Sequence, residues 1–135
     1  MKEYFIKHIV NGRYPKYITS ATREGFSTHD NFLIYRFHPN ESSPKMISIE
    51  NIDADGDGRG TVLVARVAKK ALDVGVHHLT GMFQPRKDRE RTKLWYKHRG
   101  FEVTEDNELF ANSQNVYALC MQILSAYSTI ITDLT

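Results

Sequence analysis

The chain has 135 residues, of which 41% are hydrophobic and 25% are charged, and its formal net charge at pH 7 is +2. This length and balance suit one globular domain over residues 1–135, and the weak net charge gives little reason to expect a nucleic-acid partner. A lone cysteine, Cys120, excludes an internal disulfide and favours the reducing cytoplasm, while the absence of a long apolar run or a signal peptide at residues 1–10 argues against a membrane.

The first third of the chain reads as strands separated by turns. Tyr4 to Val10 has the pattern of a short strand, and a short helix is expected around Thr19 to Glu24. Phe32 to His38 and Lys45 to Ile52 are rich in β-branched and aromatic residues, and the turn-forming segment 39–44 separates them. These two segments predict an antiparallel hairpin.

The middle of the chain predicts a strand–helix–strand unit. Residues 61–74 form a helix pattern that is apolar except for one narrow stripe, and Gly75 is suited to ending it. His77 to Phe83 then reads as a strand, which would lie parallel to the strand at 45–52.

The last part of the chain predicts a basic helix at about 86–98, ended by Gly100, and a strand that begins at 101–103. Residues 104–114 are polar and read as a loop, and Val116 to Leu124 reads as a final strand before a tail at 125–135. The fold class is therefore α/β, with a mixed sheet in which an antiparallel hairpin precedes a βαβ unit.

The most specific chemical signal is a glycine-rich turn that opens the helix pattern at residues 56–61. Free backbone N–H groups and the positive end of the helix dipole at such a turn favour a bound anion. The residues concerned are Gly56, Gly58, Arg59, Gly60 and Thr61. A polar Asp-Gly turn without a ligand is the plain alternative.

Two motifs together resemble the GCN5-related N-acetyltransferases. The segment Gly58-Arg59-Gly60-Thr61 before a helix that ends at Gly75 is similar to that family's acyl-CoA-binding pattern. The segment Trp95 to Phe101 resembles its aromatic-Tyr-x-x-x-Gly-Phe signature at a matching distance downstream. The resemblance covers about residues 32–124 and implies the acyl-CoA N-acyltransferase fold of a divergent member.

The resemblance also implies a site. The strands at 45–52 and 77–83 would part to admit acetyl-CoA, and the turn at 56–61 would hold its pyrophosphate. Glu50 would be the general base for an amine of a small molecule or protein, and Tyr96 the acid that protonates the leaving thiolate.

Departures from the family pattern support a second hypothesis. Asp55 and Asp57 place negative charge where a pyrophosphate would lie, and Arg89 stands where the family commonly has Asn. The antizymes, which share this fold, bind a protein without a coenzyme and resemble the chain around 88–103. The alternative is therefore a non-catalytic module that binds a protein. A homodimer is a further expectation, because a second copy could complete the acceptor site that a short N-terminal region leaves open.

The other residues with reactive or charged side chains can be interpreted as structural. An EF-hand reading of the Asp-rich segment from Asp53 fails because its twelfth position is Val64, so no metal is expected. Glu50 could equally be a solvated strand residue, and Tyr96 a core aromatic. The basic residues between 86 and 99 are typical of a solvated helix face, and Cys120 of a core position.

Overall fold

The computed structural model describes residues 4–11, 14–20, 31–53, 59–84 and 88–125, and for the first two ranges only the backbone. In chain order the elements are β1 Tyr4–Asn11, β2 Tyr14–Ser20, β3 Asn31–His38, β4 Met46–Asp53, α1 Arg59–Asp73, β5 His78–Met82, α2 Arg89–Lys97, β6 Glu102–Val103, β7 Glu108–Asn112 and α3 Ser113–Leu124.

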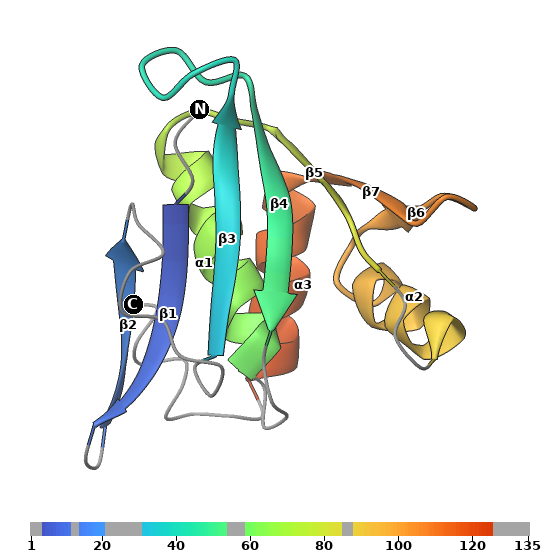
Figure 1. Cartoon of the computed structure of the whole chain (residues 1–135), viewed down its shortest axis with the longest axis horizontal. Coiled ribbons are helices and arrows are strands. Elements are labelled where there is room, and N and C mark those ends of the chain that lie inside the picture. Colours follow the sequence, from blue (N-terminus) through green and yellow to red (C-terminus); the bar gives the residue numbers. More distant parts are fainter. Residues whose placement is uncertain (1–3, 12–13, 21–30, 54–58, 85–87, 126–135) are drawn as a thin grey trace.

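The strands form one seven-stranded sheet in the order β2-β1-β3-β4-β5-β7-β6 (Figure 1). The expected hairpin is confirmed, because β3 and β4 pair antiparallel. The expected βαβ unit is confirmed as well, because β4 and β5 pair parallel with α1 between them. The other pairs of neighbouring strands are antiparallel.

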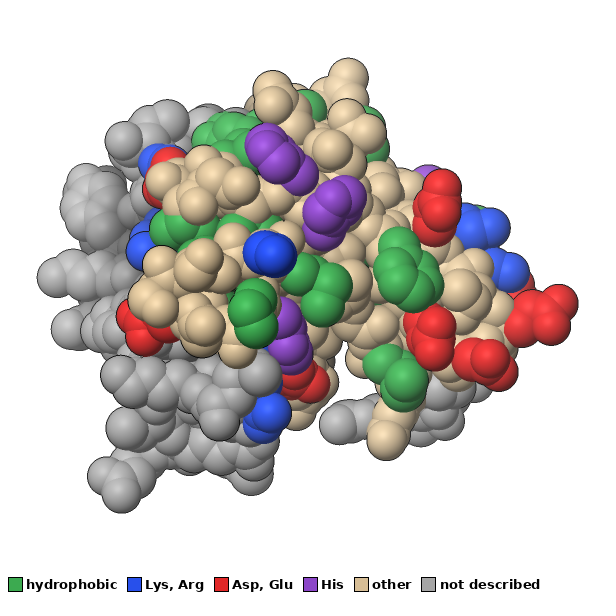
Figure 2. All heavy atoms as spheres, turned by 90° about the horizontal axis from the view of Figure 1, so that it is seen from above, with side chains coloured by type: hydrophobic (Ala, Val, Ile, Leu, Met, Phe, Trp, Pro, Cys, Tyr) green, Lys and Arg blue, Asp and Glu red, His purple; other side chains and the backbone are tan. Residues whose placement is uncertain are grey.

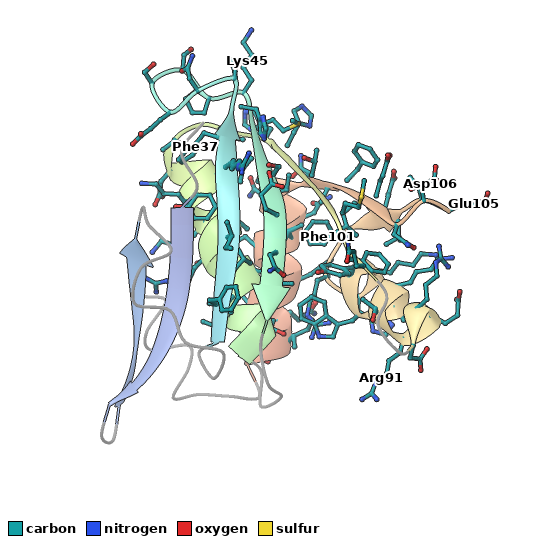
Figure 3. All side chains as sticks on the ribbon, viewed as in Figure 1. Phe37, Lys45, Arg91, Phe101, Glu105 and Asp106 are labelled. Carbon is teal, nitrogen blue, oxygen red and sulfur yellow. The ribbon has the colours of Figure 1, made fainter. Side chains whose placement is uncertain are left out.

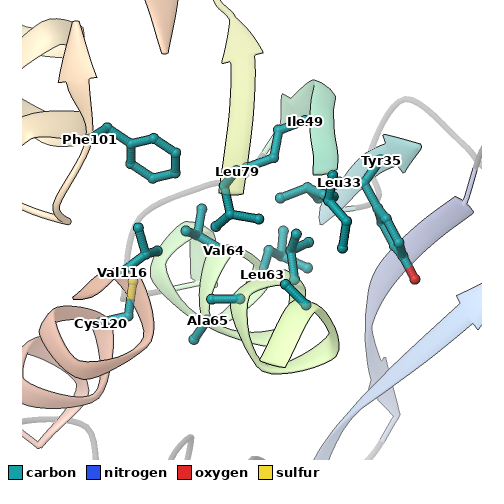
Figure 4. Close-up of a cluster of buried hydrophobic side chains, with 14 of the residues drawn as sticks. Leu33, Tyr35, Ile49, Leu63, Val64, Ala65, Leu79, Phe101, Val116 and Cys120 are labelled. Atoms are coloured by element: carbon teal, nitrogen blue, oxygen red, sulfur yellow. The ribbon is translucent and has the colours of Figure 1, made fainter. Parts of the chain in front are cut away.

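Helices α1 and α3 lie side by side against one face of the sheet (Figure 1). The sheet residues under them are apolar and buried, among them Leu33, Tyr35, Phe37, Ile47, Ile49, Leu79 and Leu109, and this surface is called the covered face below. Figure 4 shows Leu63, Val64 and Ala65 of α1 packed within this cluster. Because α1 touches the sheet and also α3, it is apolar nearly all round, and its polar stripe is narrow.

Glycine ends α1 as expected. Gly75 adopts φ +77°, a conformation that residues with a Cβ rarely adopt, and its N–H donates to the carbonyl oxygen of Leu72. The N–H of Val76 then donates to the carbonyl oxygen of Ala71, and buried Val76 leads the chain back towards β5. This ending places β5 beside β4.

The strand expected at Val116 to Leu124 is wrong, because this segment is helix α3. Asn112 caps its N-terminus by accepting hydrogen bonds from the N–H groups of Gln114 and Asn115. The fully buried residues are Ser113, Val116, Cys120 and Leu124. Their spacing of three or four residues is helical, and it was hidden by apolar residues at the positions between them.

Two shorter expectations also need correction. Residues 104–114 are not all loop, because 108–112 form strand β7 between β5 and β6. Thr19 and Ser20 belong to strand β2 rather than to a helix, and residues 21–24 lie outside the described part of the chain. In β7, Leu109, Phe110 and Ala111 are apolar but only Leu109 is buried, and this short apolar stretch between polar residues gave a weak strand signal.

A search of the described helices found none that combines the length and apolarity needed to cross a membrane.

Candidate functional site

Strands β4 and β5 run together for only part of their length. Their pairing joins residues 47–49 to residues 79–81, whereas β4 continues to Asp53. Figure 1 shows the two strands diverging beyond this paired stretch, with α2 on the side to which β5 turns. The sheet therefore opens between β4 and β5, as the resemblance implied.

Glu50 lies in a β-bulge at the point of divergence. Tyr35 of β3 faces Ile49 and Ile34 faces Asn51, so Glu50 is the extra residue of β4. A bulge bends its strand and changes the direction in which a side chain points. The bulge and the end of the β4–β5 pairing fall together, and Glu50 stands beside the opening.

Gly81 allows the two strands to approach closely just before they part. A Cβ atom at this position would lie 2.9 Å from the carbonyl oxygen of Ile49 and 3.3 Å from Cδ1 of Leu109. A larger residue would therefore push β5 away from β4 or from β7. The glycine is a requirement of the sheet at the edge of the opening.

The side chain of Glu50 belongs to a polar network on the sheet surface opposite α1 and α3. Ser48 Oγ donates to Glu50 Oε1 at 2.7 Å, and Arg36 Nε lies 3.8 Å from the same oxygen. His38 Nε2 lies 2.7 Å from Ser48 Oγ. We call the surface formed by Arg36, His38, Ser48, Glu50 and Thr80 the open face.

Tyr96 lies in an aromatic cluster at the inner side of α2. Its ring stacks on Phe83, with the centroids 5.4 Å apart, and meets Trp95 and Phe101 edge to face at 5.0 and 5.6 Å. Phe101 lies between α2 and the sheet (Figure 3). Burial raises the pKa of Tyr96 from 10.0 to about 12, and the nearby positive charge of Arg99 opposes this only in part.

Glu50 and Tyr96 have separate surroundings. The groups that hold Glu50, Ser48 and Arg36, are on β3 and β4, whereas the cluster around Tyr96 comes from α2 and from the ends of β5 and β6. Glu50 lies at the bulge of β4, and Tyr96 lies on α2. The structure does not join their side chains in one network.

The start of α1 is tied to the end of α2 by Arg99. Arg99 donates from Nε and Nη2 to Thr61 Oγ1, at 3.0 and 2.8 Å, and from Nη1 to the carbonyl oxygen of Trp95 at 2.8 Å. Its guanidinium carbon lies 3.8 Å from the centroid of the Trp95 ring. A fixed positive charge therefore stands at the first turn of α1, where the helix dipole is also positive.

Only part of the expected phosphate cradle is described. Arg59 begins α1, Gly60 is half-buried and Thr61 is buried, with its hydroxyl bound to Arg99. Gly56 and Gly58, together with Asp55 and Asp57, lie outside the described residues.

Arg89 has a structural role that its position in the motif did not indicate. It donates from Nε to Asn107 Oδ1 at 2.7 Å, and from Nη2 to the carbonyl oxygens of Thr104 and Glu105 at 3.3 and 3.2 Å. Asn107 has φ +63°, which Asn tolerates better than most residues, and it closes the turn between β6 and β7. Glu105 and Asp106 point outward from this turn (Figure 3). Arg89 and Arg99 are thus not part of a purely solvated helix face.

Sequence reasoning missed Ser48, His38 and Arg99. The period-two alternation of β3 and β4 was a signal for the first two, because it places Arg36, His38 and Ser48 on one surface. Arg99 gave no such signal, since its partner Thr61 is 38 positions away in the sequence.

The order of elements decides the fold. A parallel pair crossed by a helix, which parts beyond Gly81, is followed by α2 with the aromatic motif and by the antiparallel strands β7 and β6. The chain therefore has a mixed α/β fold, and the expected fold class is confirmed. Its order of elements is the one that the resemblance to the GCN5-related N-acetyltransferases implied.

The chain is similar to solved structures that contain AtaT or KacT. A mutant AtaT toxin bound to the C-terminus of antitoxin AtaR is 21% identical, with 68% of this chain and 64% of that chain covered and a TM-score of 0.48. AtaTR bound with AcCoA is 23% identical, with 78% and 71% covered and a TM-score of 0.49. The KacTA–DNA complex is 21% identical, with 83% and 76% covered and a TM-score of 0.49.

The chain thus spans about two thirds of the length of the AtaT toxin chain, 64%, and the similarity concerns the fold. No protein-family model and no curated protein sequence matches the chain.

Two further features of the described residues bear on chemistry. Burial raises the pKa of the Cys120 thiol from 9.0 to about 12, which keeps the thiol protonated and unreactive. Within the described ranges, no three His, Cys, Asp or Glu side chains gather closely enough to hold a metal ion.

Proposed function

We propose that the chain transfers an acetyl group from acetyl-CoA to an amine of a small molecule or protein. The observation that carries this proposal is the coincidence of three features: β4 and β5 part, the bulge falls at the same point, and Glu50 is the bulged residue. Beyond Ile49 the edge of β4 is no longer paired with β5, and the bulge places a carboxylate at this edge.

Acetyl-CoA would lie in the opening between β4 and β5, with its phosphates towards the start of α1. The backbone N–H groups of the first turn and the helix dipole would attract the phosphates. The positive charge of Arg99 beside Thr61 would add to this attraction and offset part of the repulsion expected from Asp55 and Asp57. The glycines at 56 and 58 are proposed to complete this site.

The proposed reaction needs one proton to leave the amine and another to reach the thiolate. The amine nitrogen attacks the thioester carbonyl carbon, its proton passes to Glu50, and the carbon–sulfur bond breaks. The leaving thiolate takes the proton of the Tyr96 hydroxyl, and the resulting phenolate regains a proton from water before the next turnover. The Tyr96 hydroxyl, whose pKa burial raises to about 12, carries its proton at neutral pH.

A second function is supported by a different observation. Arg89, which replaces the family's Asn at the start of α2, is engaged by the turn between β6 and β7. It therefore serves the fold at a position where the family commonly has Asn. Together with Asp55 and Asp57, this favours a non-catalytic module that binds a protein partner or a second copy of the chain.

The comparisons add a partner class to each hypothesis. One AtaT structure contains an antitoxin segment and one AtaTR structure contains AcCoA, so a protein partner and acetyl-CoA are both reasonable proposals for this chain. The KacTA structure contains DNA. The comparisons therefore give no support to the expectation that the chain has no nucleic-acid partner.

Calorimetric titration separates the two functions. We expect acetyl-CoA to bind to the full chain with micromolar affinity, and coenzyme A without the acetyl group to compete for the same site. A panel of primary amines, lysine peptides and polyamines with acetyl-CoA should then release free thiol. Absence of binding at millimolar acetyl-CoA would overturn the enzyme proposal, and a stable stoichiometric complex with a captured protein would then favour the module.

A further inference from the structure

The polar network on the open face continues past Glu50 to Ser48 and His38, which have no part in the proposed transfer step. Ser48 lies between Glu50 and His38, at 2.7 Å from each. Arg36 of β3 and Ser48 of β4 are paired across the two strands. This register places the side chains of Arg36, His38 and Ser48 on one surface of the sheet. The hydrogen bonds run from the bulge towards the end of the sheet where β3 ends and β4 begins.

The donors and acceptors in this network are determined by the Ser48 hydroxyl. It has a single proton, which it donates to Glu50 Oε1. The contact with His38 therefore requires a proton on Nε2 of His38, which donates to Ser48 Oγ. In this resting arrangement the hydrogen bonds point from His38 through Ser48 to the carboxylate.

The second carboxylate oxygen of Glu50 remains for another group. Among the described residues, Oε2 accepts no hydrogen bond, and the Glu50 side chain is 39% exposed. An amine in the opening could therefore approach Oε2 while Ser48 holds Oε1. The two oxygens would have different roles, one towards the substrate and one towards the protein.

We propose that Ser48 and His38 form the route by which Glu50 loses the proton that it takes from the amine. This inference rests on the proposed function. Once Glu50 is protonated, its carboxylic acid donates to Ser48 Oγ, and the Ser48 proton passes to Nε2 of the neutral ring of His38 in its other tautomer. The ring then gives one proton to water, so the proton count balances and Glu50 is a carboxylate again.

The exit of this route is at the surface. His38 is half-buried, and its carbonyl oxygen accepts a hydrogen bond from the N–H of Lys45 at the end of the turn. Lys45, labelled in Figure 3, marks this end of the two strands. Figure 2 looks onto the same end and shows histidine side chains at the surface, with basic (Lys or Arg) and hydrophobic side chains beside them.

The charged and titratable groups around His38 come from four places. Arg36 lies two residues before it on β3, Glu50 lies beyond Ser48 on β4, and Lys45 follows the turn. His78 of β5 is level with Met46, the β4 residue that faces His38. Arg36 is placed to hold the negative charge of Glu50, whereas Ser48 links Glu50 to His38.

The hydrogen bonds can be tested without any activity. We expect the ring ¹⁵N chemical shifts of neutral His38 to show the proton on Nε2 in the wild-type chain. In Ser48→Ala we expect the proton to shift towards Nδ1, because the acceptor on the Nε2 side is lost. His77, an exposed histidine outside the network, should keep its spectrum and serves as the internal control. An identical tautomer of His38 in both proteins would overturn the inference.

Activity then tests the proton route itself. His38→Gln keeps an amide donor near Ser48 but cannot exchange protons, so we expect kcat to fall about tenfold with unchanged KM for acetyl-CoA. Imidazole added to His38→Ala should restore part of the rate, which a purely structural role would not allow. His77→Gln is the matched control and should behave as the wild-type chain does.

Failure of the proton route and failure of the proposed function would give different experimental results. If the wild-type chain transfers acetyl groups and His38→Gln is equally fast, the proton route is wrong and the proposed function stands. If the wild-type chain transfers none while the tautomer of His38 depends on Ser48, the proposed function is wrong, the catalytic route falls with it, and only the hydrogen bonds remain.

Discussion

The two faces of the sheet are built from neighbouring residues with opposite roles. On β5, Leu79 is 1% exposed and packs on the covered face, while the next residue, Thr80, lies on the open face. On β4, Ile47 and Ile49 are buried, while Ser48 and Glu50 form a polar network. Burial of the residues on the covered face holds the strands in place, and the residues on the open face can therefore be polar without loss of the core.

The largest effect is expected from Glu50→Gln on the open face. If Glu50 is the base, kcat should fall by about 10²–10⁴-fold, because the amide cannot accept the proton of the amine. The free energy of unfolding should change by less than about 1 kcal/mol, since the ion pair with Arg36 is partly exposed. Steady-state kinetics and urea unfolding measure the two quantities, and a large loss of stability would contradict the separation of the faces.

The next largest effect is a difference in the free energy of unfolding between substitutions at two adjacent residues of β5. Leu79→Ala removes buried methyl groups from the covered face and should lower the free energy of unfolding by about 2–5 kcal/mol. Thr80→Ala on the open face should change it by no more than about 0.5 kcal/mol. Equal losses in chemical denaturation would show that the two faces do not differ in their contribution to stability.

Alkaline pH should lower the free energy of unfolding, because two buried acidic groups stay protonated in the folded chain. These groups are the thiol of Cys120 and the hydroxyl of Tyr96. Because the pKa of Cys120 is raised from 9.0 to about 12, the unfolded chain releases this proton first, and stability is lost as pH rises above 9. Tyr96 adds the same sign of effect above pH 10, since its pKa is raised to about 12. Each group contributes at most about 1.4 kcal/mol per pH unit.

Thermal unfolding between pH 7 and 10.5 measures this loss. Cys120→Ala should be less stable at pH 7 because of its cavity, but its midpoint should fall less steeply above pH 9. Tyr96→Phe should reduce the slope only above pH 10. Parallel curves for the wild-type chain and both variants would contradict the buried protonated acids.

The smallest effect is expected at Arg99, which ties the end of α2 to the start of α1 through its hydrogen bonds with Thr61. Arg99→Gln removes the fixed positive charge beside Thr61, so acetyl-CoA should bind about tenfold more weakly, a loss of about 1.4 kcal/mol. Lys97→Gln makes the same charge change at an exposed position of α2 and should leave the affinity nearly unchanged. Equal affinities of the two variants in calorimetry would exclude a role of Arg99 at the phosphates.

Much of the fold could be predicted where a segment carries its own pattern. Helix α1 has a long apolar run that Gly75 ends, and β3 and β4 have β-branched and aromatic residues on both sides of a turn. Helix α3 was mistaken for a strand because half-buried apolar residues fill the spaces between its buried ones. Strand β7 was mistaken for a loop because its exposed residues outnumber its one buried leucine.

The candidate site could be predicted only in part. The aromatic motif located Tyr96, and the end of a strand located Glu50, because both are features of the local sequence. The network around Glu50 depends on the register between β3 and β4, and the tie between Arg99 and Thr61 depends on how α2 packs beside α1. Neither relation leaves a pattern within a short segment.

The sequence by itself determined the elements that have a strong local period or a clear stop signal, and hence the βαβ unit and the positions of its motifs. Only the tertiary structure decided where β4 and β5 part, that Glu50 is the bulged residue there, and that Ser48 connects it to His38. The reason is physical: local backbone preferences and burial act within a segment, whereas register, bulges and hydrogen bonds between strands form only when distant segments pack together.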